Sequence, residues 1–255
     1  MNATEISFAG WLLLLASGVM IGLSKTGLPG VGFAAIPLVA LVIPARLSTG
    51  VVLPMLIFGD LFAVVYYRRK AVWSHLLKLI PWAAAGIVLG YFLLKWAPGG
   101  KIWLDDLRLR RIIGAVILVL LFLNYWYLKR RPSEKEVPDY WWFAALVGLV
   151  AGVTTMMANA AGPVLIIYLL AMRLPKVEFV GTAAWYFFLL NWFKVPFSAS
   201  LGFINVQSLL LNAAVLPAIA VGAVSGIWLL KYIPEKTFTA VIQVVAALAA
   251  LKLLF

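Results

Sequence analysis

The stretch that decides the fold is Gly18–Pro37, which reads GVMIGLSKTGLPGVGFAAIP and lies between two apolar runs. It contains one lysine, five glycines and two prolines. A lysine at hydrocarbon depth costs roughly 2.5–3.5 kcal/mol on insertion scales, so it usually has a partner or a task. Irregular backbone persists in a membrane only where it packs against protein or lines a cavity. We therefore expect a helix that stops beside Lys25 and restarts near Gly30, with free N–H groups that favour an anion.

The composition indicates a membrane protein. Of the 255 residues, 65% are hydrophobic and only 12% are charged, whereas soluble domains are about half apolar and a quarter charged. The apolar runs are long and continuous, which favours helices over a barrel. The chain has no cysteine, which excludes disulfides, thiolate metal sites and cysteine nucleophiles. We expect its net charge of +12 to reflect cytoplasmic loops, with a basic vestibule adding attraction for anions.

Ten apolar segments follow one another along the chain. They cover approximately residues 6–24, 30–43, 47–67, 76–96, 110–128, 140–157, 161–171, 177–203, 206–230 and 236–254. The first two segments of each five are short and flank a broken region. Each such pair would be either two short spans or one re-entrant hairpin, and the sequence leaves this open.

The two halves of the chain resemble each other. Gly18 and Gly22 are echoed by Gly148 and Gly152; Pro44, Gly50 and Asp60 by Pro175, Gly181 and Asn191; and Pro81, Gly86, Gly90, Lys95 and Pro98 by Pro217, Gly222, Gly226, Lys231 and Pro234. Small residues spaced by four allow close helix packing. The predicted fold is therefore an all-α polytopic bundle of two repeats, residues 1–128 and 140–255, each with a broken or re-entrant first helix pair and three full spans. A charged cytoplasmic linker, residues 129–139, joins them.

An odd number of crossings in each half would insert the second half upside down relative to the first. With both termini outside, twelve lysines and arginines lie in the cytoplasm and seven outside, which favours this orientation. Inverted repeats with breaks at matching places are typical of secondary transporters.

Two charged residues of the first half are candidates for a function at membrane depth. Lys25 is either a functional cation or a lysine that reaches the surface from a helix end or loop. Asp60 is the only acidic residue inside a predicted span of the first half. It could pair with Lys25, hold a lysine in place, accept a proton or make a purely structural bond; Arg68, about 12 Å further along a helix, is too far for a local pair.

The matching segment of the second half contains Asn191 and Lys194, whose spacing of three places them on one helix face. Lys194 is far from either end of its segment, so it is the strongest candidate for a functional cation. Pro196 is expected to break the helix and free carbonyl groups.

The second broken region has no charge. Thr154, Thr155 and Asn159 offer neutral hydrogen bonds, and Pro163 suits the first turn of a restarting helix. Inverted symmetry would place this break opposite Lys25. A site with one cationic and one neutral half suits a small anion better than a metal ion, which would need several carboxylates.

His75 is expected in a solvated loop. No catalytic constellation is present, so neither an enzyme nor a cofactor is predicted, and basic residues confined to short loops argue against nucleic acid.

These residues together resemble the TauE/SafE sulfite exporter family. The resemblance rests on the break Gly22–Gly32, on the span Pro44–Asp60 with its following basic, tyrosine-rich loop, on Asn191 with Lys194, and on Gly222 with Gly226. It covers nearly the whole chain. It implies a carrier of the bacterial inner membrane with two related halves that moves sulfite or organosulfonates, generally outward.

The predicted function is an alternating-access carrier for a small sulfur-containing anion, in contact with membrane lipids and coupled to protons. Lys25 and Lys194 would supply positive charge, and Asp60 would orient a lysine or accept the coupling proton. The remaining predicted contacts are Gly27, Gly30, Asn191, Asn159 and Thr155. An uncoupled anion channel and a non-transporting membrane scaffold are the alternatives, and homo-oligomers are left open.

Overall fold

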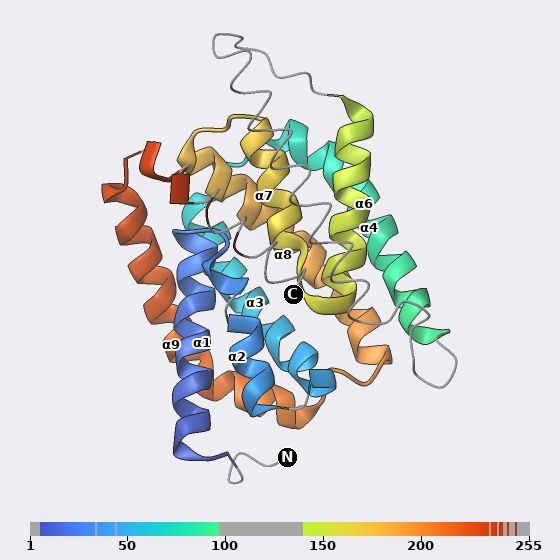
Figure 1. Ribbon diagram of the computed structural model, residues 1–255, viewed down its shortest axis with the longest axis vertical. Coiled ribbons are helices and arrows are strands. Elements are labelled where there is room, and N and C mark those ends of the chain that lie inside the picture. The colour runs from blue at the N-terminus through green and yellow to red at the C-terminus, as the bar shows by residue number, and fades with distance from the viewer. Residues whose placement is uncertain are drawn as a thin grey trace. The chain divides into compact units, whose positions relative to one another are not determined.

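The computed structural model describes residues 6–33, 35–43, 45–96 and 140–234, with scattered residues between 236 and 248. Within these ranges the chain forms eight α-helices and no strand (Figure 1). The helices are α1 (Phe8–Thr26), α2 (Ala35–Val42), α3 (Ala45–Tyr67), α4 (Trp73–Lys95), α6 (Trp141–Ala158), α7 (Ala161–Ala171), α8 (Lys176–Ser200) and α9 (Val206–Tyr232), with a 3₁₀ turn, η2 (Val31–Phe33), between α1 and α2. Each coincides with a predicted segment. The predicted segment 110–128 and linker 129–139 lie outside the described residues, as does most of segment 236–254.

The predicted break after Lys25 is confirmed. Helix α1 begins at the N-cap Ser7, whose side chain accepts a hydrogen bond from the Gly10 N–H, and it ends at Thr26. The prediction that the helix restarts near Gly30 is wrong. Gly30 has a φ of 106°, which no helical residue adopts, and regular α-helix resumes only at Ala35 after the 3₁₀ turn. The preceding Pro29 favours a turn here.

Four helices are long and apolar enough to cross a membrane, counted over the described residues. They are Phe8–Thr26, Gly50–Tyr67 within α3, Trp73–Lys95 and Val206–Tyr232. Helix α8 has 25 residues, but its polar and aromatic side chains keep it outside this set. Helices α2 and α7 have 8 and 11 residues. At about 1.5 Å per residue they are too short for a hydrocarbon core of about 30 Å. Each break therefore joins a helix of 18 or 19 residues to a much shorter one.

The chain divides into two compact units, each assembled from both halves of the sequence. One comprises Met1–Trp73 with Val180–Ile233, and the other Ser74–Phe179 with Pro234–Phe255. These units differ from the predicted repeats, because a repeat describes sequence similarity and a compact unit describes packing. The repeat boundaries stay a prediction.

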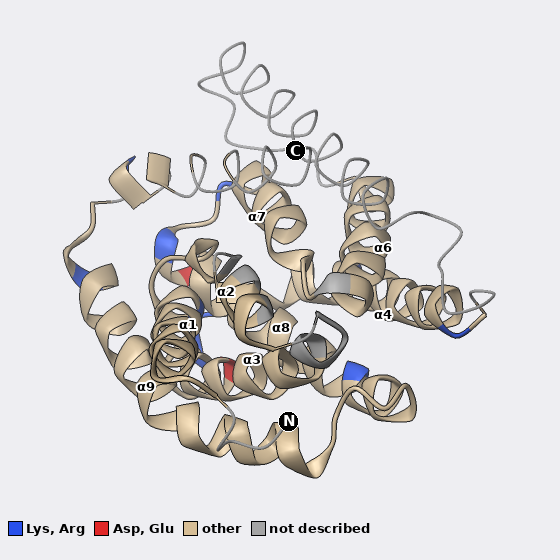
Figure 2. Cartoon of the chain, turned by 60° about the horizontal axis from the view of Figure 1, so that its bottom comes forward, with Lys and Arg blue, Asp and Glu red and all other residues tan. Residues whose placement is uncertain are grey.

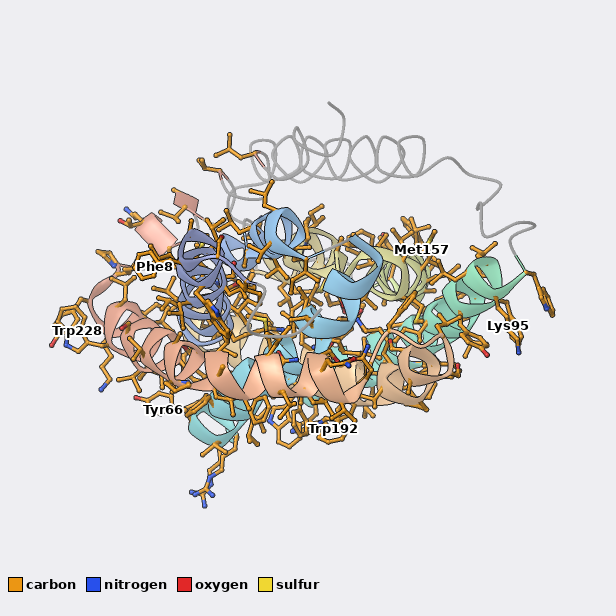
Figure 3. All side chains as sticks on the ribbon, turned by 90° about the horizontal axis from the view of Figure 1, so that it is seen from below. Phe8, Tyr66, Lys95, Met157, Trp192 and Trp228 are labelled. Carbon is orange, nitrogen blue, oxygen red and sulfur yellow. The ribbon has the colours of Figure 1, made fainter. Side chains whose placement is uncertain are left out.

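The core of the first unit lies where α1 packs against α2, α3 and α9. Its buried residues include Leu14, Ile21, Val39, Met55 and Ile219. In Figure 2 most of the described residues are tan, the colour of residues other than Lys, Arg, Asp and Glu. Large apolar side chains also lie on the outer side of this unit: Phe8, Trp192 and Trp228, labelled in Figure 3, are 80%, 53% and 61% exposed. In a protein with several candidate spans, such a surface is suited to lipid.

Glycines bring α1 and α9 into backbone contact in the first unit. A Cβ on Gly22 would meet the Ile219 carbonyl, and one on Gly222 would meet the Val19 carbonyl. The second unit contains a similar crossing of α4 and α6, where a Cβ on Gly86 would meet the Leu149 carbonyl and one on Gly152 the Ala83 carbonyl. Such close approaches are typical of small-residue motifs in membrane helices.

The α1–α9 crossing predicts a sharp effect of a single methyl group. Replacing Gly222 with Ala should lower the free energy of unfolding by about 1–3 kcal/mol, because backbone atoms must move to admit the Cβ. The thermal unfolding midpoint of the purified protein in detergent measures this. Ala214→Val, on the exposed side of the same helix, is the matched control, and equal midpoints for the two variants would contradict the packing role.

Candidate functional site

Lys25 lies in the last turn of α1, held there by the way the helix ends. The N–H groups of Gly27 and Leu28 both donate to the Leu23 carbonyl, and the following Pro29 cannot continue a helix. The Lys25 Nζ lies 2.7 Å from the Asp60 Oδ1, and the two side chains are 9% and 0% exposed. The predicted pairing of Asp60 with Lys25 is present, and the Lys25 side chain is largely buried rather than extended to the surface.

Asp60 lies in α3 and also contacts α8. The Asn191 Nδ2 donates a 2.6 Å hydrogen bond to the Asp60 Oδ2, so the two carboxylate oxygens face two different partners. Both residues are buried, with Asn191 2% exposed. The carboxylate therefore joins three helices, α1, α3 and α8, at one point within the first unit.

Phe187 is a member of this cluster that the sequence analysis missed. The Lys25 Nζ lies over its ring, 4.0 Å from the centroid, at a distance suited to a cation–π interaction. Phe187 precedes Asn191 by four residues and Lys194 by seven, which is the spacing of one helix face. That periodicity was the available signal, but the phenyl ring resembles the many aromatic residues of this chain that meet lipid.

Lys194 follows Asn191 by about one turn of α8 and is only 1% exposed. It lies close enough to both Lys25 and Asp60 for their charges to interact. The structure thus brings together four of the predicted site residues: Lys25, Asp60, Asn191 and Lys194. Among the described residues of this unit, Asp60 is the only carboxylate, and no group of three metal-binding side chains occurs in the described chain.

The end of α1 is anchored to its neighbours beside the cluster. The Thr26 Oγ1 donates to the Ala223 carbonyl at 2.7 Å and lies 3.1 Å from the Gly22 carbonyl, while the Tyr67 hydroxyl donates to the Thr26 carbonyl at 2.8 Å. Gly27, predicted as a substrate contact, packs against Gly226 so closely that a Cβ would lie 2.6 Å from the Gly226 Cα. Its observed contacts are those of packing, and its contact with a substrate stays a prediction.

A comparison with known families identifies the family of the chain. The family model for the sulfite exporter TauE/SafE matches residues 14–253, nearly the whole chain. This protein belongs to the TauE/SafE family. The family consists of membrane transporters of sulfur-containing anions, not of enzymes. No curated protein and no solved structure gives a significant match.

The second break of this TauE/SafE protein also forms where the sequence predicts it. Helix α6 ends at Ala158, Asn159 adopts the left-handed conformation with a φ of 54°, and α7 begins at Ala161 with Pro163 in its first turn. Thr155 and Asn159 are 4% and 7% exposed. They belong to the second compact unit, and their part in a site with Lys25 stays a prediction.

Two smaller predictions are wrong. Helix α8 does not break at Pro196 but runs on to Ser200; the proline only removes the helical N–H donor for the Trp192 carbonyl. His75 is not in a solvated loop. It lies half-buried in the first turn of α4, with its Nδ1 3.0 Å from the Tyr168 hydroxyl.

The ion pair in this TauE/SafE chain predicts strongly coupled effects on stability. Asp60→Ala should lower the free energy of unfolding by about 3–5 kcal/mol, because it leaves the Lys25 charge buried without its partner. Combining Lys25→Met with Asp60→Leu should recover most of that loss, because an apolar pair needs no compensation. Thermal unfolding of the single and double variants measures the coupling, and additive losses would show that the two side chains act independently.

Proposed function

We propose that this protein is a secondary transporter that moves a small sulfur-containing anion, sulfite or an organosulfonate, across the bacterial inner membrane by alternating access. The observation that supports it is the burial of Lys25 and Lys194 around a single carboxylate, Asp60. Membrane proteins rarely bury charge without a function. Among the described residues of this unit, two cations surround one anion, an arrangement that suits an anionic substrate.

The substrate would bind between the two ammonium groups. Lys25 is already oriented, because Asp60 and the Phe187 ring hold its Nζ. An arriving oxyanion would share or replace these contacts. A free carboxylate would repel it, so Asp60 would stay ionised and paired while the substrate is bound, with the Asn191 amide as one partner. It would accept the coupling proton only after the substrate has left.

The remaining proposed contacts come from the backbone and the second break. Gly30 lies in the turn that follows Lys25, and Thr155 and Asn159 would supply neutral hydrogen bonds from the second half-site. Helix starts after both breaks would add N–H groups with the favourable end of the helix dipole. In this proposal the protein exports its substrate with proton coupling, and both ends of the chain lie outside the cell membrane.

The two inverted repeats are part of this proposal, supported by equivalent contacts in the two glycine crossings. In the first unit Gly18 faces Val215, Ala218 and Ile219, and in the second Gly148 faces Leu79, Trp82 and Ala83. Residues of α6 follow their counterparts in α1 by 130 positions, and residues of α9 follow those in α4 by 136. With the same two offsets, the contact between Gly22 and Gly222 corresponds to the contact between Gly152 and Gly86. Each compact unit would thus combine helices of both repeats.

Asp60 and Asn191, the residue pair at the centre of the cluster, also fit the proposed repeat. Asp60 and Asn191 are the equivalent positions of α3 and α8, 131 residues apart, and they hydrogen-bond to each other. The repeats would therefore differ where their equivalent helices meet: one contributes the charge and the other a neutral amide.

The proposed function predicts that Lys194→Ala abolishes transport and leaves a folded membrane protein. Removing the ammonium group takes away half of the positive charge offered to the substrate. Counter-flow of radiolabelled sulfite in proteoliposomes measures transport, and size-exclusion chromatography of the same preparation measures folding.

Lys231→Ala is the matched control, because Lys231 is an exposed lysine at the end of α9 in the same unit. It should transport like the wild type. Normal counter-flow by Lys194→Ala would remove this lysine from the site.

A further inference from the structure

The described side chains of the buried cluster differ in formal charge. Lys25 and Lys194 contribute two positive charges and Asp60 one negative charge, whereas Asn191 and Phe187 contribute none. With the three ionisable groups charged, the cluster carries +1. This sum is set by side chains that are almost completely buried, with Lys25 the most exposed at 9%.

Net charge matters here because the surroundings are apolar. Charges removed from water are stabilised only when opposite charges compensate them at short range. A singly charged anion brings the cluster to neutrality, whereas a doubly charged anion leaves one negative charge uncompensated, next to the Asp60 carboxylate.

We propose that this site, if it carries out the transport proposed above, takes singly charged sulfur oxyanions, such as hydrogen sulfite or a monosulfonate, and discriminates against doubly charged ones such as sulfate. Asp60 sets this preference by cancelling one of the two lysine charges. Asn191 positions the Asp60 carboxylate but does not change the net charge of the cluster.

The test uses three tetrahedral sulfur anions as competitors of sulfite counter-flow in proteoliposomes of the full-length protein. Methanesulfonate and methyl sulfate carry one negative charge, and sulfate carries two. Methyl sulfate has the same four oxygens as sulfate, so the pair separates charge from shape. Both monoanions should inhibit at concentrations at least about tenfold below sulfate, the ratio that 1.4 kcal/mol produces.

Two variants separate charge from geometry. Asp60→Asn raises the sum to +2 and should shift the preference toward sulfate by about tenfold or more. Asn191→Ala removes the hydrogen bond to Asp60 without changing the sum, so its ratio of sulfate to methyl sulfate inhibition should match the wild type. A shift in Asn191→Ala as large as that in Asp60→Asn would overturn the charge explanation.

The wild-type ratio decides the proposal even where Asp60→Asn does not fold. Sulfate inhibition equal to or stronger than that of methyl sulfate, in a preparation that exchanges sulfite, would overturn the charge preference and leave the transport function standing. Absence of sulfite exchange by folded protein would instead overturn the transport function itself, and this inference with it.

Discussion

The Lys25–Asp60 ion pair is the contact on which the rest of the site depends. It joins the last turn of α1 to the middle of α3 in apolar surroundings, and the Asn191 amide extends it to α8. Buried ion pairs contribute little net stability, because desolvation offsets their attraction. Their presence is therefore better explained by specificity or function than by stability. Here the pair orients one lysine, and a second buried lysine, Lys194, follows Asn191 by about one turn of α8.

Close helix packing provides the rigid frame for this cluster. The α1–α9 crossing depends on glycines that allow backbone contact, and the anchors of Thr26 to Ala223 and of Tyr67 to Thr26 fix the end of α1 where Lys25 lies. A site that must distinguish anions needs ammonium groups held to within a fraction of an ångström. Packing at backbone distance restricts movement of the helix end more than flexible side chains would.

Much of this arrangement could be predicted from the sequence. Long apolar runs indicate membrane helices, and a charged residue within such a run is unusual. Lys25, Asp60 and Lys194 stand out for that reason, and Asn191 through its spacing of three from Lys194. Phe187 did not, since a cation–π contact depends on which helices meet. Pro196 was misjudged because proline weakens a helix without always ending it when packing holds the chain. The restart of the helix at Ala35 depended on the local conformation of Gly30, which a glycine-rich stretch leaves undetermined.

The most direct measurement of the central claim is an anomalous diffraction map, at the selenium edge, of crystals grown with selenite as an analogue of sulfite. If the buried cluster is the anion site, a selenium peak should lie within hydrogen-bond reach of both the Lys25 Nζ and the Lys194 Nζ. A peak that occurs only at exposed basic residues such as Arg68 or Lys231, in crystals of otherwise ordered protein, would contradict the assignment of this cluster as the anion site.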